Sequence, residues 1–492
     1  MPRHTPFRAR VAALAIAVFS VVAAAAPMNV LLIIVDDYGW ADVGVNNPET
    51  FYETPRLDAF AASGANLARG YAGAPVCSPT RVSIMSGVNP VLDGATEWFW
   101  DRPARSMRYW SADRINFLPL HRTTIAEVLR DEGYQTLWVG KWHLGGSDRH
   151  LPQSRGFDKN VAGGAFGNPG WKTGFFAPYA EWMNLEAPEG EHLPVRLTDE
   201  TIGWLRDRDQ TRPFFATLSY YSVHTPLDGR PDLVQKYEAR RDALGLTDEE
   251  RFGREEQIWP GQPARRVRVA QDHAVYAAMV EAMDEQIGRL LDAVDEMGLA
   301  DDTLVMFVSD NGGLSTAEGA PTANTPLRAG KGWLYEGGIR VPFMVRWPGV
   351  TTPGQVVESA MHTSDIFPTI LDAVGADTDQ PRLAELEGRS MRADLTGTGT
   401  TRPLFFHYPH YGNQGGYPGA AVLLDRFKYV LRYEDGQSAL YDIESDPSEV
   451  DNIVEANPAL AESMHALLVD WLGEHGARFL GPRTPDDLPW RP

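Results

Sequence analysis

The sequence predicts an α/β protein: a sandwich in which helices cover both faces of a mostly parallel sheet, followed by a small C-terminal subdomain with an antiparallel sheet and a helix. Two observations predict this fold. Short β-rich apolar runs alternate with helical segments along most of the chain. From about Thr401 the strand candidates become closely spaced and are separated by Gly, Asp and Asn turns.

The strand candidates of the larger part lie at residues 28–35, 134–139, 214–221, 304–308 and 341–347. Helix candidates alternate with them. Thr54-Pro55 and Gly64 bound one predicted helix, and residues 123–132 form a second. Apolar residues recur with helical spacing between 274 and 297, which predicts a long helix. In the C-terminal part we expect strands at 404–408, 421–424, 428–433 and 438–441, and a helix from 458 to about 475.

The N-terminus has the pattern of a cleavable signal peptide. Three arginines precede an apolar run at 11–22, and four alanines follow at 23–26. That run is too short to span a bilayer, and no later stretch reaches transmembrane length. We therefore expect a signal peptide over 1–26, a catalytic domain over 27–395 and a subdomain over 396–492, in a periplasmic or secreted protein.

Net charge and cysteine content limit the classes of function and of cross-link that the chain can have. The formal net charge of −21 argues against general nucleic-acid binding, which needs a basic face. The chain has one cysteine, Cys77, so an exported form can hold no intrachain disulfide. A lone exported thiol is incidental, reactive or chemically converted, and composition does not choose among these.

Polar side chains follow four of the predicted strands, at the edge where an open α/β sheet binds ligands. They are Asp36 and Asp37, Lys141 and His143, His224, and Asp310 and Asn311. The three carboxylates and the amide oxygen favour calcium or magnesium over zinc. Either acidic pair alone could instead be a turn or a helix cap; the two pairs together favour a metal site.

The stretch Cys77-Ser78-Pro79-Thr80-Arg81 points to anion chemistry. Pro79 suits the first turn of a helix, which places residue 77 near a positive N-terminus and Arg81 one turn further on. A cysteine-phosphatase loop would need a longer Gly-rich anion cradle before the arginine. Cys-x-Pro-x-Arg is also the pattern that formylglycine-generating enzymes recognise.

The ordered set of motifs resembles the type I, formylglycine-dependent sulfatase family of the alkaline phosphatase superfamily. The matching stretches are VDDYGWADVG, CSPTRVSIMSG, GYQTLWVGKWHLG, YSVHTPL, SDNGG, GKGWLYEGGIRVP and LYDIESDPSEVDN. The resemblance implies an alkaline-phosphatase-like α/β/α sandwich and a sulfuric ester hydrolase. It also implies a maturase that oxidises Cys77 to formylglycine.

The resemblance further implies a role for each matching residue. One Ca²⁺ would be held by Asp36, Asp37, Asp310, Asn311 and the modified residue 77. Arg81 would hold the hydrated aldehyde, Lys141 and Lys331 would neutralise sulfate oxygens, and His143 and His224 would be the acid/base pair. Cations spread over the sulfate oxygens stabilise the charge of the transition state. On this reading one hydroxyl of the hydrate would attack sulfur while His224 protonated the leaving alcohol; the second, deprotonated by His143, would then collapse to the aldehyde and expel sulfate.

Aromatic and polar residues around two further segments suggest a carbohydrate substrate, because a sugar stacks its CH face and hydrogen-bonds through its hydroxyls. The predicted substrate residues are Trp98, Trp100, Asp101, Arg102, His410 and Asn413. The segment 407–417 is also similar to parts of bacterial exo-acting glycan sulfatases, including those that act on galactose or N-acetylgalactosamine units. Two alternatives stay open: a phosphonate or phosphodiester hydrolase of the same superfamily, and a non-catalytic glycan-binding pseudoenzyme.

Overall fold

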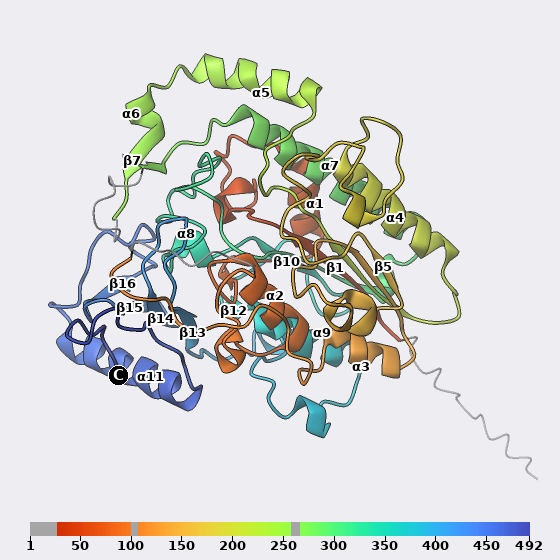
Figure 1. Ribbon diagram of the computed structural model, residues 1–492. Coiled ribbons are helices and arrows are strands. Elements are labelled where there is room, and N and C mark those ends of the chain that lie inside the picture. The colour runs from red at the N-terminus through yellow and green to blue at the C-terminus, as the bar shows by residue number, and fades with distance from the viewer. Residues whose placement is uncertain (1–26, 100–106, 257–265) are drawn as a thin grey trace, which may run out of the picture.

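The computed structural model describes residues 27–99, 107–256 and 266–492 (Figure 1). Its centre is an eight-stranded sheet whose neighbouring strands are, in order, β11 (Gln355–Val357), β2 (Ala65–Leu67), β10 (Phe343–Arg346), β9 (Thr303–Ser309), β1 (Asn29–Val35), β6 (Phe214–Ser219), β4 (Gln135–Gly140) and β5 (Lys159–Val161). Only β10 runs antiparallel to its neighbours. The predicted mostly parallel sheet is confirmed.

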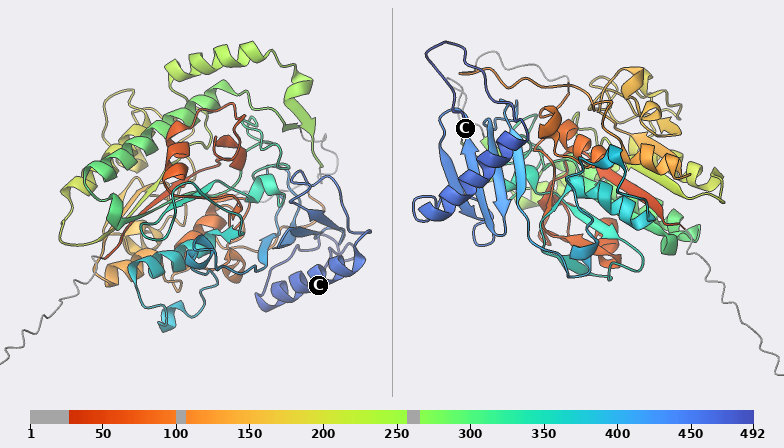
Figure 2. Two further views of the ribbon diagram at one scale, coloured as in Figure 1. Left: turned by 180° about the vertical axis from the view of Figure 1, so that it is seen from behind. Right: turned by 90° about the horizontal axis from the view of Figure 1, so that it is seen from below.

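Helices cover both faces of this sheet, as predicted. One face packs against α1 (Pro55–Ser63), α4 (Leu193–Asp207) and α7 (Ala274–Glu296), and α5 (Pro231–Leu244) packs on α7. The other face packs against α2 (Cys77–Ser86), α3 (Ile125–Asp131) and α9 (Ile366–Val374). Alternate residues of β1 divide between the two cores, because successive strand side chains point to opposite faces. Figures 1 and 2 show these three layers.

The C-terminal part forms its own layer beside the sandwich, most clearly in the right view of Figure 2. Four antiparallel strands lie in sequence order, β13 (Leu404–Tyr408), β14 (Gly419–Leu424), β15 (Phe427–Arg432) and β16 (Ser438–Asp442), and α11 (Pro458–Glu474) packs on β14 and β15. The predicted antiparallel sheet with one packed helix is confirmed. Between the last strand of the large sheet and β13 lies the short helix α10 (Arg392–Leu395).

A buried ion-pair network joins the two parts. The Lys428 ammonium on β15 lies 3.1 Å from a Glu336 carboxylate oxygen and 2.9 Å from one of Glu449, and the Tyr71 hydroxyl donates to Glu336 at 2.9 Å. Breaking such a pair on one side costs about 3–5 kcal/mol, because an uncompensated charge stays buried. Glu336 begins α8 (Glu336–Ile339), so the network also anchors the loop that carries Lys331.

Two short strand pairs and one short helix also flank these layers. They are β3 (Gly70–Tyr71) paired with β12 (Met361–His362), β7 (Phe252–Arg254) paired with β8 (Arg266–Arg268), and α6 (Asp248–Arg251). Among the described residues, no helix combines the length and apolarity that crossing a membrane requires. The predicted signal peptide lies outside the described residues.

Candidate active site

The predicted strand-end residues converge at one edge of the sheet. β1 and β9 are paired in register with Val35 opposite Ser309, so the residues that follow, Asp36 and Asp310, leave the sheet side by side. Lys141 follows β4 directly, and its amide N–H donates to the carbonyl of Ser219 at the end of β6 at 2.8 Å. Strand pairing therefore explains why residues more than 270 positions apart meet here.

Four donor groups form a compact, buried cluster. One ligand atom from each of Asp36, Asp37, Cys77 and Asp310 lies within 4.8 Å of the others. The Asn311 amide donates to Asp37 Oδ1 at 2.9 Å. Two oxygen atoms of this group, Asp36 Oδ1 and Asn311 Oδ1, are buried without a hydrogen-bond partner in the described part of the chain. Unsatisfied hard oxygen donors among three carboxylates fit a divalent cation such as Ca²⁺.

Three cationic side chains enclose the cluster. The Lys141 ammonium lies 2.5 Å from Asp36 Oδ2, the Lys331 ammonium lies 2.6 Å from Asp37 Oδ1, and Arg81 Nε donates to Asp310 Oδ2 at 2.7 Å. All three ion pairs are buried. Burial raises the pKa of Asp36, and the neighbouring Asp310 raises it further. Burial acts in the same direction on Asp37, but Lys331 and His224 outweigh it, so the pKa of Asp37 falls below its usual range.

Residue 77 occupies the position that the motif predicted. Cys77 is the first residue of α2, and Arg81 lies one turn further along the helix. Arg81 donates to the Lys141 carbonyl at 2.7 Å and to Ser219 Oγ at 2.8 Å, while its buried Nη2 has no partner in the described chain. Burial raises the pKa of the Cys77 thiol far above its usual value. A free thiolate nucleophile is therefore disfavoured here, whereas the spare Arg81 donor suits an anion or a hydroxyl.

The two histidines have different surroundings. His143 is buried, and its Nε2 lies 3.3 Å from the Phe99 carbonyl while Nδ1 has no partner among the residues described. The partner of Nε2 assigns the proton to that nitrogen, which leaves Nδ1 as an acceptor. His224 Nδ1 lies 2.6 Å from the Thr225 carbonyl, so His224 Nε2, 3.8 Å from Asp37 Oδ2, is the nitrogen that faces the cluster.

The pKa values of both histidines are lowered. Burial and then Lys331 lower the pKa of His224 to about 4, against the opposing effect of Asp37. Burial, Lys141 and Arg81 lower the pKa of His143. Both rings are thus neutral at neutral pH in the free protein. An anion bound beside Lys331 would oppose the effect of that lysine and favour the protonated form of His224.

No sequence motif marks one residue at the edge of this cluster, Glu318. Its carboxylate accepts hydrogen bonds from Thr225 Oγ1 and from Asn413 Nδ2, both at 2.9 Å. Lys331 and His224 lower the pKa of Glu318 against the effect of burial. The residue lies in a loop without a recognisable motif, and only the folded chain brings it beside His224 and the predicted substrate residue Asn413.

The other predicted substrate residues differ in whether the structure leaves them accessible to a ligand. The segment that carries Trp98 does pack against the segment that carries His410, through a Thr96 Oγ1–His410 Nε2 contact of 2.7 Å. His410 itself is only 1% exposed, so its ring supports the fold of this segment and does not line the surface. Trp98 is half-buried, and its indole nitrogen has no partner in the described chain. Trp100, Asp101 and Arg102 lie outside the described residues.

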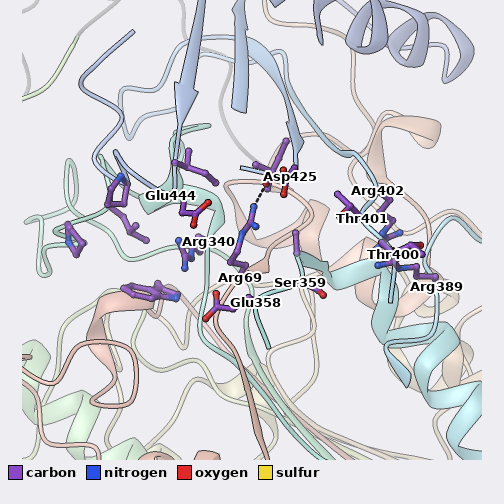
Figure 3. Close-up of a pocket in the computed structure, with 17 residues that line it drawn as sticks. Arg69, Arg340, Glu358, Ser359, Arg389, Thr400, Thr401, Arg402, Asp425 and Glu444 are labelled. Carbon is purple, nitrogen blue, oxygen red and sulfur yellow. Dashed lines mark hydrogen bonds between the residues drawn. The ribbon is translucent and has the colours of Figure 1, made fainter. Parts of the chain in front are cut away.

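A cavity of about 620 Å³ lies elsewhere, between the sandwich and the C-terminal sheet (Figure 3). No predicted catalytic or metal-binding residue lines it. Its arginines are engaged by the protein: Arg69 donates to the Asp425 carbonyl, and Arg340 donates to the Ala68 carbonyl at 2.7 Å. Acidic side chains such as Glu444 line the same walls. This cavity is a contact region between the two parts of the chain and not the reaction site.

Comparisons with known proteins agree with this geometry. The family model Sulfatase matches residues 28–376, and the model N-sulphoglucosamine sulphohydrolase, C-terminal matches residues 329–472. A sulfatase of Formosa agariphila is 28% identical over 91% of this chain and 89% of its own length. Human N-acetylgalactosamine-6-sulfatase is 28% identical over 77% of this chain and 68% of its own.

Solved structures show the same fold. The structure of Ps i-CgsB in complex with k-i-k-neocarrahexaose superposes with a TM-score of 0.72 at 25% identity, and covers 91% of this chain and 93% of that one. The phosphonate monoester hydrolase of Agrobacterium radiobacter superposes with a TM-score of 0.61 at 21% identity over 94% of this chain and 100% of its own, which shows a shared fold alone.

Proposed function

The chain belongs to the sulfatase family, and on that premise we propose that this sulfatase removes sulfate from a carbohydrate outside the cytoplasm, with one Ca²⁺ and with formylglycine formed from Cys77 by a maturase. The observation that carries the proposal is the buried cluster of Asp36, Asp37, Cys77 and Asp310. A buried thiol with a raised pKa makes a poor nucleophile, and its place among metal-type ligands suits a modified residue.

Asp36, Asp37, Asp310 and Asn311 would hold the calcium ion, together with residue 77. The ion would supply a positive charge that stabilises negative charge on the sulfate oxygens in the transition state. Formylglycine, as its hydrate, would supply the hydroxyl nucleophile that a buried cysteine lacks. The unsatisfied oxygens of Asp36 and Asn311 support this assignment, because the described chain offers them no other partner.

The remaining residues act on charge and protons. Lys141 and Lys331 are paired with Asp36 and Asp37 in this structure. Once a cation neutralises those carboxylates, the two ammonium groups would also interact with the sulfate oxygens. Arg81 Nη2 would donate to a hydroxyl on residue 77. His224, whose side chain is 11% exposed, directs Nε2 toward the cluster, where it can protonate the leaving alcohol, and His143 Nδ1 can accept a proton.

Two of the named relatives support a glycan substrate: the human protein is named N-acetylgalactosamine-6-sulfatase, and the structure of Ps i-CgsB is a complex with k-i-k-neocarrahexaose. Asn413, held by Glu318 close to His224, supports hydrogen bonding to sugar hydroxyls. A galactose- or N-acetylgalactosamine-type unit is our specific proposal. A pseudoenzyme is disfavoured, since every predicted catalytic position is filled.

A substrate panel tests the proposal. We expect the purified, matured protein to hydrolyse sulfate esters of defined mono- and disaccharides, with higher kcat/KM than for phosphodiester and phosphonate esters with the same leaving group. The Cys77→Ala variant is the control for contaminating activity. Faster turnover of the phosphorus esters would assign the chain to the alternative hydrolase class, and binding of sulfated sugars without turnover would identify a pseudoenzyme.

The two histidines should respond differently to the leaving group. His224→Ala is expected to lower kcat by at least about a hundredfold on a sugar sulfate, because a poor alkoxide leaving group needs a general acid. The loss should be much smaller on an activated aryl sulfate. His143→Ala should lose activity on both and release alcohol in a burst before sulfate appears. Rapid-quench measurement of released alcohol and sulfate distinguishes the two roles. Equal losses of activity for both variants on both substrates, without a burst of alcohol, would contradict this division of roles.

A further inference from the structure

An exposed aromatic side chain lies in a loop that contacts His143 and the segment before His224. Phe166 is 53% exposed, in the loop that follows β5. Its ring centroid lies 5.0 Å from that of Trp182, at an angle of 45° between the ring planes. Single exposed apolar residues are common on protein surfaces and need no explanation. What distinguishes Phe166 is the way its loop is attached to the reaction site.

On one side the loop contacts His143. The His143 amide donates to the Gly164 carbonyl at 3.1 Å. Gly167 packs so tightly on the imidazole that a Cβ there would lie 2.6 Å from its Cε1 atom. Phe166 directly precedes Gly167, so the Cα atoms of the two residues are about 3.8 Å apart.

On the other side the loop contacts the segment that carries His224. The Trp182 ring lies 6.1 Å from the ring of the buried Tyr221, three residues before His224. The Tyr221 hydroxyl donates to the Ala162 carbonyl at 3.0 Å. Asn160 Oδ1 accepts from the Gly163 amide at 3.0 Å, which further restrains the start of the loop. The loop that carries Phe166 is therefore attached to both histidine segments, and its restraint lowers the entropy cost of binding against it.

From this arrangement we propose that Phe166 and Trp182 form an aromatic ledge that stacks on a sugar ring next to the one that carries the sulfate ester. The inference rests on the proposed carbohydrate substrate and adds a second binding position to it. The flat apolar face of an aromatic ring suits the CH face of a sugar, and Phe166 directly precedes Gly167, which packs on the His143 ring.

The test compares chain lengths in the matured, Ca²⁺-loaded enzyme. The probes are the sulfated monosaccharide that the panel shows to be turned over, and the disaccharide that bears it as a terminal unit. We expect Phe166→Ala to raise KM for the disaccharide by about 3- to 10-fold with kcat unchanged, the range that one aromatic contact supplies. KM for the monosaccharide should not change.

Matched variants separate stacking from folding. Phe166→Tyr keeps a flat ring and should restore the disaccharide KM, whereas Phe166→Leu keeps an apolar side chain without the flat face and should not. Leu244→Ala, on the outer helix α5 and 49% exposed, is the control for loss of surface apolar area. Equal KM values for wild type and Phe166→Ala on the disaccharide, or equal losses on both probes, would overturn the ledge.

Two other outcomes are distinguishable. If the wild-type enzyme hydrolyses aryl sulfates but no sulfated sugar, the proposed carbohydrate function fails and the ledge fails with it. If Phe166→Ala changes the molar mass in solution, measured by light scattering, and leaves the disaccharide KM unchanged, the exposed ring serves contact between copies of the chain and the proposal is wrong.

Discussion

Replacing Cys77 with alanine is expected to lower kcat on sulfate esters by about 10⁴-fold or more, the scale on which loss of a covalent nucleophile acts. Cys77 is the first residue of α2 and lies within 4.8 Å of ligand atoms of Asp36, Asp37 and Asp310. No other described side chain of this cluster can take the place of a hydroxyl nucleophile. Ser86→Ala, on the same helix but outside the cluster, should keep wild-type activity.

A serine at position 77 should behave differently from alanine. Its hydroxyl can attack sulfur once, but it offers no second hydroxyl with which to release sulfate. Cys77→Ser should therefore release at most about one equivalent of alcohol per enzyme and then stop. Mass spectrometry of the tryptic peptide 70–81 should show an aldehyde at residue 77 in active wild-type protein. Full activity from protein whose peptide carries only the thiol would refute the proposed chemistry.

Removing the metal should have the second largest effect. We expect a chelator to lower kcat/KM by about a thousandfold, since a Lewis-acidic cation supplies several kcal/mol of transition-state stabilisation, and Ca²⁺ to restore it. Asp36→Asn should show a similar loss that Ca²⁺ does not repair. The substitution keeps the shape of the side chain and an oxygen acceptor for Lys141, while it removes one of three carboxylate charges from the site.

Thermal stability provides a readout that does not depend on turnover. Ca²⁺ at a hundred times its Kd should stabilise the wild-type protein by about 2.7 kcal/mol and raise its Tm, whereas the Tm of Asp36→Asn should not respond. Asp42→Asn is the matched control. Asp42 is also fully buried, but Thr322, Tyr276 and Gln271 donate to it at 2.6–2.9 Å, so it lies outside the cluster. That variant should be less stable and still respond to Ca²⁺. An unchanged Tm of the wild type in Ca²⁺ would show that the cluster holds no calcium.

The boundaries of the elements around the site followed from local patterns. The strand predicted at 304–308 is β9 (Thr303–Ser309), and the helix predicted at 274–297 is α7 (Ala274–Glu296). Hydrophobic periodicity and capping residues act over a few positions, so they are visible in the sequence. The strand predicted at 341–347 is β10 (Phe343–Arg346), but its antiparallel direction depends on how the chain returns to the sheet, which no local pattern records.

The sequence by itself predicted that Asp36, Asp37 and Asp310 meet, because they follow parallel strands and parallel strands end at a common edge. That Cys77, the first residue of α2, joins them was predicted only from the motif around it. Only the tertiary structure decided which side chains complete the surroundings. Glu318, His410 and Phe166 owe their positions to contacts with residues that are distant in sequence, such as Asn413, Thr96 and Trp182. The sequence around Phe166 does not reveal that its side chain is exposed, and the sequence around His410 does not reveal that its ring is buried. Whether each side chain is exposed or buried is decided when loops from separate strands pack together, because burial depends on the tertiary packing of the whole chain and not on the neighbouring residues.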